Sequence, residues 1–83
     1  MIKNKIFLQT LDDVKEFVAV SMSRNYDIEL LSGKYVVNAK SIMGVFSLDL
    51  TQPLTMVANT ESDDKLHGLI EKFLYVEPAT AVK

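Results

Sequence analysis

The chain of 83 residues has a formal net charge of −2, with 48% hydrophobic residues, 24% charged residues and no cysteine. These values predict one soluble globular domain over residues 1–83, and they exclude disulfides, thiolate zinc sites and cysteine nucleophiles. The basic residues are scattered, which argues against nucleic acid binding. The apolar runs are too short for a signal peptide or for the ~20 residues of a membrane span, so we expect a cytoplasmic protein.

The first third of the chain predicts a strand and then an amphipathic helix. Residues 5–9 have strand character, and Thr10 can cap a helix that follows. Asp12 and Asp13 then occupy the first turn, where carboxylates interact favourably with the helix dipole. We expect this helix to run to about Arg24 on one apolar stripe, made of Leu11, Val14, Phe17, Val18 and Met22.

The middle of the chain predicts a β-hairpin and a further strand. Residues 26–31 and 35–39 read as two strands that are joined by a tight turn at Ser32–Gly33. A short helix is expected directly after Ser41. A last strand over residues 53–59 can begin at its proline, because a strand tolerates proline at its first position.

A second amphipathic helix closes the chain. Thr60-Glu-Ser-Asp-Asp is a helix-start signature in which we expect Ser62 to be the cap. Pro78 should end this helix and leave a frayed tail of five residues. The apolar stripe has helical spacing and consists of Leu66, Leu69, Ile70, Phe73 and Leu74. The order β-α-β-β-short α-β-α predicts an α+β fold, with helices on one face of a mostly antiparallel sheet and the other face open to water.

The residues that could carry chemistry are few. His67 is the only histidine, and one histidine alone makes no relay or metal site. The adjacent carboxylates Asp12–Asp13 and Asp63–Asp64 are explained by the dipoles of the helices that they begin. The three glycines are isolated, so no glycine-rich phosphate loop is present. We therefore predict no enzyme activity, no cofactor and no metal.

The segment 38–50 carries the strongest functional signal. Ser41 stands at the expected N-cap of a helix too short to bury more than one stripe. Val45 and Leu48 share one side of that helix. The other side of the helix consists of Ile42, Met43 and Phe46. Either these three side chains face solvent or a partner, or the whole segment belongs to the core. An exposed patch of this kind would serve a homodimer or a complex with another protein equally well.

Ser41 has two interpretations. It is either a simple N-cap serine or a phosphorylation site, because a phosphate there would lie beside free backbone N–H groups and the cation of Lys40. In the second case the added charge would change the field next to the apolar patch, as a regulatory switch requires.

These residues also resemble a known family. Asn-Ala-Lys-Ser-Ile-Met-Gly-Val-Phe-Ser-Leu at residues 38–48 is similar, nearly residue for residue, to the segment around the regulatory serine of HPr. HPr is the phosphocarrier of the bacterial sugar phosphotransferase system. The resemblance implies an open-faced β-sandwich with a four-stranded antiparallel sheet in the order 1-4-2-3. It also implies that Ser41 matches the serine modified by HPr kinase/phosphorylase, and that the residues around it contact protein partners such as a catabolite-control regulator: Lys40, Ile42, Met43 and Phe46.

The chain departs from that family at the phosphoryl-carrying motif. HPr proteins carry a His-Ala-Arg-Pro motif at the start of the first helix, and its four places fall here on or near Asp12, Asp13, Val14 and Lys15. At these four places there is neither the imidazole that would carry the phosphoryl group nor the guanidinium that would hold its oxygens. The chain is similar in this respect to the catabolite-repression HPr homologue, which also lacks the histidine and keeps the serine.

Three hypotheses follow for the function. The first is a regulatory HPr-like protein that is phosphorylated on Ser41 and does not relay phosphoryl groups through histidine. The second is an interaction module that keeps the fold and has no phosphorylation role. The third is an active phosphocarrier that uses His67 or Asp12, which the chemistry disfavours because a relay needs a positioned imidazole.

Overall fold

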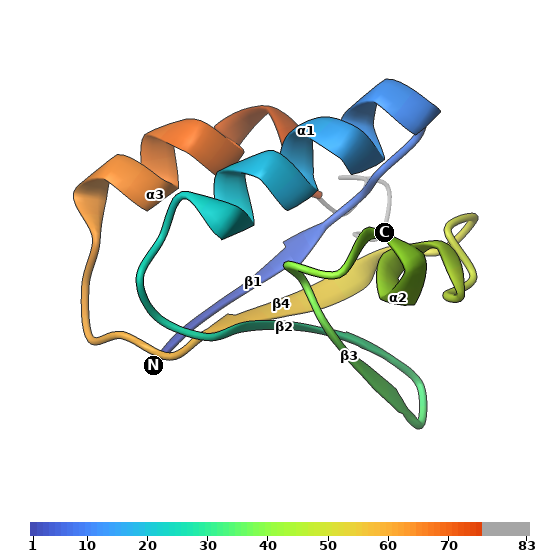
Figure 1. Ribbon diagram of the computed structural model, residues 1–83, viewed down its shortest axis with the longest axis horizontal. Coiled ribbons are helices and arrows are strands. Elements are labelled where there is room, and N and C mark those ends of the chain that lie inside the picture. The colour runs from blue at the N-terminus through green and yellow to red at the C-terminus, as the bar shows by residue number, and fades with distance from the viewer. Residues whose placement is uncertain (76–83) are drawn as a thin grey trace, which may run out of the picture.

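The computed structural model describes residues 1–75 and has two layers, a sheet and the helices that cover one of its faces (Figure 1). Helices α1 (Leu11–Met22) and α3 (Asp64–Ile70) lie side by side over that face, and a 3₁₀ turn at Glu71–Phe73 continues α3. The short helix α2 (Ile42–Phe46) contacts α1 and the strand β3 (Tyr35–Asn38). The remaining strands are β1 (Ile2–Ile6), β2 (Ile28–Ser32) and β4 (Leu54–Ala58).

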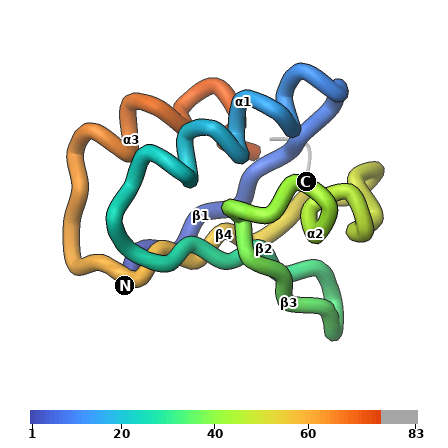
Figure 2. Tube along the Cα trace, viewed as in Figure 1, coloured from blue at the N-terminus to red at the C-terminus, as the bar shows by residue number. Residues whose placement is uncertain are grey.

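The sheet is antiparallel and has the strand order β1-β4-β2-β3, which confirms the predicted order 1-4-2-3 and the α+β class. Ala58 of β4 pairs with Ile2 of β1 on one side and with Ile28 of β2 on the other. The hairpin of β2 and β3 joins the rest of the sheet through the pairing of β2 with β4, and Figure 2 shows the path of the chain through this hairpin. The order places the first and fourth strands side by side although they are far apart in sequence.

The core lies between the sheet and the helices. Along β4 the side chains alternate, so that Leu54, Met56 and Ala58 are buried while Thr55 and Val57 point to the open face. Phe17 of α1 packs edge-on against Phe73, with 5.8 Å between the ring centroids. These contacts hold both long helices on the same face of the sheet.

The predicted apolar stripe of α1 is confirmed in its centre and wrong at its ends. Val14, Phe17 and Val18 are buried, whereas Leu11 is 55% exposed and Met22 is 64% exposed. Helical spacing fixes the side of a helix on which a residue lies, but it does not fix how far the core extends along the axis. The helix itself ends at Met22, two residues before the predicted end.

The helix α3 begins one residue later than predicted. Its N-cap is Asp63 rather than Ser62, because a carboxylate oxygen of Asp63 accepts hydrogen bonds from Lys65 N and Leu66 N at 3.1 and 3.2 Å. The regular helix ends at Ile70 and is followed by the 3₁₀ turn, so it is shorter than the helix that was predicted to continue until Pro78. Its predicted stripe is buried at Leu66, Ile70 and Phe73, while Leu69 lies at the exposed edge and Leu74 is half-buried. Pro78 and the predicted tail lie outside the described residues.

The first strand spans residues 2–6, so the prediction of a strand over residues 5–9 is wrong by three residues. The register pairs Ile2 with Ala58 and Ile6 with Leu54, and this pairing ends where β4 begins after Pro53. Phe7 instead donates its N–H to the carbonyl of Phe73 at 2.8 Å. The other strands agree with their predicted ranges within two residues at each end.

The hairpin between β2 and β3 turns through Gly33 and Lys34. Ser32 pairs with Tyr35, and Gly33 has a φ of 59°, in the region that favours glycine. This turn agrees with the predicted hairpin. No helix within residues 1–75 has the length and apolar character needed to cross a membrane.

Candidate functional site

Ser41 is the N-cap of α2. Its Oγ accepts a hydrogen bond from Gly44 N at 3.2 Å, and its carbonyl accepts one from Val45 N at 3.0 Å. The side chain is exposed, and Ser41 has extended backbone angles with φ −104° and ψ 108°. The first turn of α2 is formed by Ile42, Met43 and Gly44, none of which is acidic. The hydroxyl is therefore accessible and has no carboxylate in the turn that it caps.

The helix α2 is divided into an anchored side and an exposed side. Val45 and Leu48 are buried in the core. Three side chains on the other side form what we call the α2 patch, consisting of Ile42 (36% exposed), Met43 (76% exposed) and Phe46 (41% exposed). The expectation that part of the segment faces solvent is thus fulfilled, and the alternative in which all five apolar side chains belong to the core is wrong.

Gly44 allows α2 to lie close to β3. A Cβ atom at this position would stand 3.4 Å from Val37 Cβ and 3.4 Å from Ser41 Oγ. Both distances are ordinary van der Waals contacts, so this turn of α2 packs directly against β3 and against its own cap.

Lys40 is half-buried and its ammonium is bound within the chain. Lys40 Nζ donates to the backbone carbonyl of Arg24 at 2.9 Å, just beyond the C-terminal end of α1. This places a cation where the α1 dipole is negative, and the last turn of α1 has no basic residue of its own. The backbone N–H of Lys40 is held by Asn38 Oδ1 at 2.8 Å. Lys40 thus fastens the segment before Ser41 to the end of α1.

A polar network lies at the same end of the helices. Asp63 Oδ2 accepts hydrogen bonds from Tyr26 Oη at 2.6 Å and from Arg24 Nη1 at 3.1 Å. The Tyr26 hydroxyl, aided by Leu66 N and Arg24, lowers the pKa of Asp63 to about 2, although partial desolvation opposes this shift. Burial, together with the bond to Asp63, raises the pKa of Tyr26 to about 12. Sequence reasoning missed this network, because 37 and 39 residues separate the partners.

The start of α1 is built differently. Thr10 Oγ1 accepts from Asp13 N at 3.0 Å, and Asp13 Oδ2 accepts from Gln9 N at 3.0 Å. Of the four positions that resemble the HPr motif, Asp12 and Lys15 are exposed, Asp13 is half-buried, and Val14 belongs to the core. Val14, at one of these four places, therefore presents no polar group to the surface.

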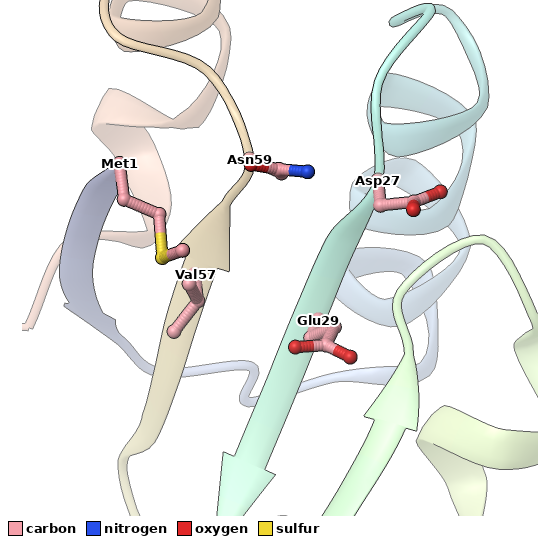
Figure 3. A pocket seen from close by; sticks show the side chains of 5 residues that line it. All are labelled: Met1, Asp27, Glu29, Val57 and Asn59. Carbon is pink, nitrogen blue, oxygen red and sulfur yellow. The ribbon is translucent and has the colours of Figure 1, made fainter.

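The remaining candidate, His67, is exposed on α3. Among residues 1–75, no three His, Cys, Asp or Glu side chains come together in a way that could hold a metal ion. A shallow pocket of about 160 Å³ lies elsewhere, on the open face of the sheet, and is lined by side chains of Met1, Asp27, Glu29, Val57 and Asn59 (Figure 3).

Solved structures give the wider context of this arrangement. The chain is similar to HPr-C-His from Thermoanaerobacter tengcongensis, with 22% identity and a TM-score of 0.72 over 87% of this chain and 89% of that one. It is also similar to the phosphocarrier protein HPr from Bacillus anthracis, with 18% identity and a TM-score of 0.67 over 89% of this chain and 96% of that one. No family model and no curated protein matches the chain.

The shared feature is the fold. The chain has the fold of HPr phosphocarrier proteins over nearly its whole length, which agrees with the resemblance seen in the sequence of residues 38–48. On that fold the exposed serine and the α2 patch lie on one short helix, while the start of α1 has no imidazole.

Proposed function

We propose that this protein is a regulatory HPr-like protein that is phosphorylated on Ser41 and binds protein partners through the α2 patch, without relaying phosphoryl groups through histidine. One observation carries the proposal: an exposed N-cap serine lies directly beside an exposed apolar patch on an HPr fold. The kinase that would phosphorylate Ser41 is of the HPr kinase/phosphorylase type. A partner such as a catabolite-control regulator would distinguish the phosphorylated from the unmodified protein. Both would act in the cytoplasm.

The chemistry of the modification suits the local structure. Ser41 Oγ attacks the γ-phosphorus of ATP and gives its proton to a base of the kinase. A new Oγ–P bond forms, the bond between the γ-phosphorus and the β,γ-bridging oxygen breaks, and ADP leaves. The phosphate carries nearly two negative charges and lies near Gly44 N, which now donates to Oγ. Since the first turn of α2 contains no carboxylate, the added charge meets no acidic neighbour in that turn. It changes the potential beside Ile42 and Met43, where a partner would bind.

The loss of the relay follows from the residues at the start of α1. A phosphoryl relay needs an imidazole that accepts and releases the group, and the only histidine of the chain is on α3. Asp12 and Asp13 present carboxylates there, and these would repel the phosphoryl oxygens that an arginine would otherwise hold. We expect no transfer of label from phosphoenolpyruvate through Enzyme I. Transfer that persists in a His67→Ala variant would point to Asp12.

The test is an incubation with HPr kinase/phosphorylase and ATP, followed by measurement of the intact mass. We expect the wild type to gain one phosphate and Ser41→Ala to gain none. Ser47→Ala is the matched control, because Ser47 is an exposed serine at the opposite end of α2, and this variant should still be modified. An unmodified wild type, under conditions that modify an authentic HPr protein, would refute the role of Ser41.

A second function is favoured by the α2 patch alone. Its three side chains are exposed whatever the state of Ser41, so the protein could be an interaction module with no phosphorylation role. Pull-downs with the wild type and Phe46→Asp separate this possibility from an inert scaffold. Met22→Asp is the control, since Met22 is also an exposed apolar residue but lies on α1. Identical partner lists for all three proteins would exclude docking through the α2 patch.

A further inference from the structure

The open face of the sheet has an ordered pattern of charge. The register aligns Lys3 of β1, Val57 of β4 and Glu29 of β2 in one row across three strands. The next row on this face aligns Lys5, Thr55 and Leu31. The strand β1 is therefore basic on this face, β4 is uncharged, and β2 is acidic where Glu29 lies.

These charges have no ion-pair partners within the described part of the chain. The ion pairs among residues 1–75 are Arg24–Asp63 and Lys72–Glu16, and neither of them lies on the open face. Lys3, Lys5 and Glu29 are all exposed. Val57 and Leu31, which lie between or beside them, are only half-buried, so the face combines free charges with apolar surface.

Two copies of the row Lys3–Val57–Glu29 that face each other in opposite directions have complementary charges. A two-fold axis that runs parallel to β4, above Val57 and between two facing sheets, carries β1 of one copy over β2 of the other. Because this rotation keeps the height along the strands, the row is read as Glu29–Val57–Lys3 in the second copy. Lys3 of each copy then faces Glu29 of the other, and the two Val57 side chains meet at the axis. In the next row the alkyl part of Lys5 covers Leu31.

We propose that two copies of this chain associate through the open faces of their sheets, with two reciprocal Lys3–Glu29 pairs around a Val57 contact. This surface lies on the opposite side of the sheet from the helices, and the proposal does not depend on Ser41 or on its modification. Two stacked sheets pack about 10 Å apart with strands within about 30° of each other. A crossing angle between the two sheets, centred on Val57, displaces the row Lys3–Val57–Glu29 less than the rows farther along the strands.

The pocket on this face supports the arrangement. Asp27 and Glu29 line one side, and Met1, Val57 and Asn59 line the other, so that two carboxylates face a wall of two apolar side chains and one amide (Figure 3). Its volume of about 160 Å³ gives room for the end of a lysine side chain. The ammonium of Lys3 from the second copy would enter here, with its methylene groups against Val57 and its charge beside the two carboxylates.

The proposed contact is small. Three strands at about 4.8 Å spacing and five residues at about 3.3 Å give a flat footprint on the order of 250 Å² per copy. This is well below the roughly 800 Å² per partner of a standard stable interface, so the association should be weak and concentration-dependent. Because it depends on exposed ion pairs, it should also weaken with added salt.

Analytical ultracentrifugation tests whether the association occurs. We expect the full chain to be monomeric at ~10 µM and to sediment increasingly as a dimer towards ~1 mM at low salt. The dimer fraction should fall in ~0.5 M NaCl, where the Debye length is only a few ångströms. A wild type that stays monomeric at ~1 mM and low salt would overturn the proposal.

Charge reversal tests the reciprocal pairing. Lys3→Glu alone and Glu29→Lys alone each place like charges opposite one another twice, so each should weaken association on the order of tenfold or more. An equimolar mixture of the two variants should recover it, because the mixed dimer contains one original pair and one reversed pair. The double variant should also associate with itself but not with the wild type.

Controls distinguish a contact through the open face from misfolding and from a contact through the α2 patch. Circular dichroism and thermal melts check that each variant is folded. Lys65→Glu is the control for charge reversal, because Lys65 lies on α3, away from the open face, and this variant should associate like the wild type. If the substitutions acted only within each folded chain, mixing Lys3→Glu with Glu29→Lys would not restore association. A dimer that is unchanged in both single variants, or one that is lost in Phe46→Asp instead, would assign the contact to another surface and refute the proposal.

Discussion

The helices α1 and α2 both begin at a side-chain hydroxyl, but their first turns differ in charge. Thr10 Oγ1 accepts from Asp13 N at 3.0 Å, and Ser41 Oγ accepts from Gly44 N at 3.2 Å. The first turn of α1 contains two carboxylates, whereas that of α2 contains none. The positive end of α1 is thus already neutralised by the chain itself, while α2 leaves its end free for an added negative charge.

The two helices also use their apolar residues differently. The middle of α1 is packed into the core through Phe17, which is fully buried against Phe73. The helix α2 is held by Val45 and Leu48 and keeps Phe46 at the surface. A residue type that serves stability in one helix is thus available for binding in the other. Substitutions in the two helices test both sides of this contrast, and the largest effect is expected in the core.

Phe17→Ala should destabilise the protein far more than Phe46→Ala. Removing the buried ring leaves a cavity and should lower the free energy of unfolding by about 3–5 kcal/mol. Removing the exposed ring should cost less than about 1 kcal/mol, since much of its surface already contacts water. Urea denaturation of both variants measures the difference. Equal losses would show that Phe46 is part of the core, and the α2 patch would then not exist as a binding surface.

The third helix, α3, begins at a carboxylate rather than a hydroxyl and should make stability depend on acid pH. The folded-state pKa of Asp63 is about 2, against an ordinary value of 3.8, so its contribution is present above about pH 3.8. That contribution is lost as the pH falls towards 2, where the folded state must also take up the proton.

The expected result is a loss of unfolding free energy between pH 4 and 2 that is smaller in Asp63→Asn than in the wild type. Tyr26→Phe should raise the pKa of Asp63 towards its ordinary value, because the tyrosine hydroxyl is the main cause of the shift. Carboxyl chemical shifts followed by NMR measure that pKa directly. A pKa of Asp63 that stays the same in Tyr26→Phe would mean that the hydroxyl does not hold the carboxylate in solution.

The network around Asp63 shows what the sequence could not reveal. Both Ser62 and Asp63 are good capping residues, and local chemistry does not decide between them. The decision comes from Arg24 and Tyr26, which reach Asp63 from a distant part of the sequence. Lys40 is a similar case, because nothing in its neighbourhood in the sequence predicts a bond to the carbonyl of Arg24.

Periodic features were predictable because they depend on local geometry. The spacing of Val14, Phe17 and Val18 correctly gave the buried side of α1, and the serine cap of α2 followed from its position before an apolar run. The exposure of Leu11 did not follow, since it depends on where the sheet ends beneath the helix. The limits of β1 were likewise set by its register with β4, which is a contact between distant segments.

The caps of α1 and α2 should differ in their contribution to stability. Thr10→Ala removes a cap from a helix of 12 residues and should lower the free energy of unfolding by about 1 kcal/mol. Ser41→Ala removes a cap from a helix of five residues that is fastened by Val45, and we expect about 0.5 kcal/mol, at the low end of the range. The denaturant midpoints of the two variants compare these losses, provided that the free energy of unfolding falls with denaturant at the same slope in both. A larger loss of stability for Ser41→Ala than for Thr10→Ala would mean that the Ser41 hydroxyl has mainly a structural role.

The smallest effect concerns charge alone. Ser41→Asp keeps a capping oxygen and adds one negative charge to an end that has none, so stability should be unchanged or rise by about 0.3 kcal/mol at low salt. Thr10→Asp makes the same change next to Asp12 and Asp13, where repulsion offsets the dipole, and it should lower stability by a similar amount. The difference between the two variants should shrink in ~0.5 M NaCl, because salt screens exposed charges. If both substitutions had the same effect at low salt, the two helix ends would be electrostatically equivalent, and the carboxylates of α1 would not make its end a worse place for an added negative charge than that of α2.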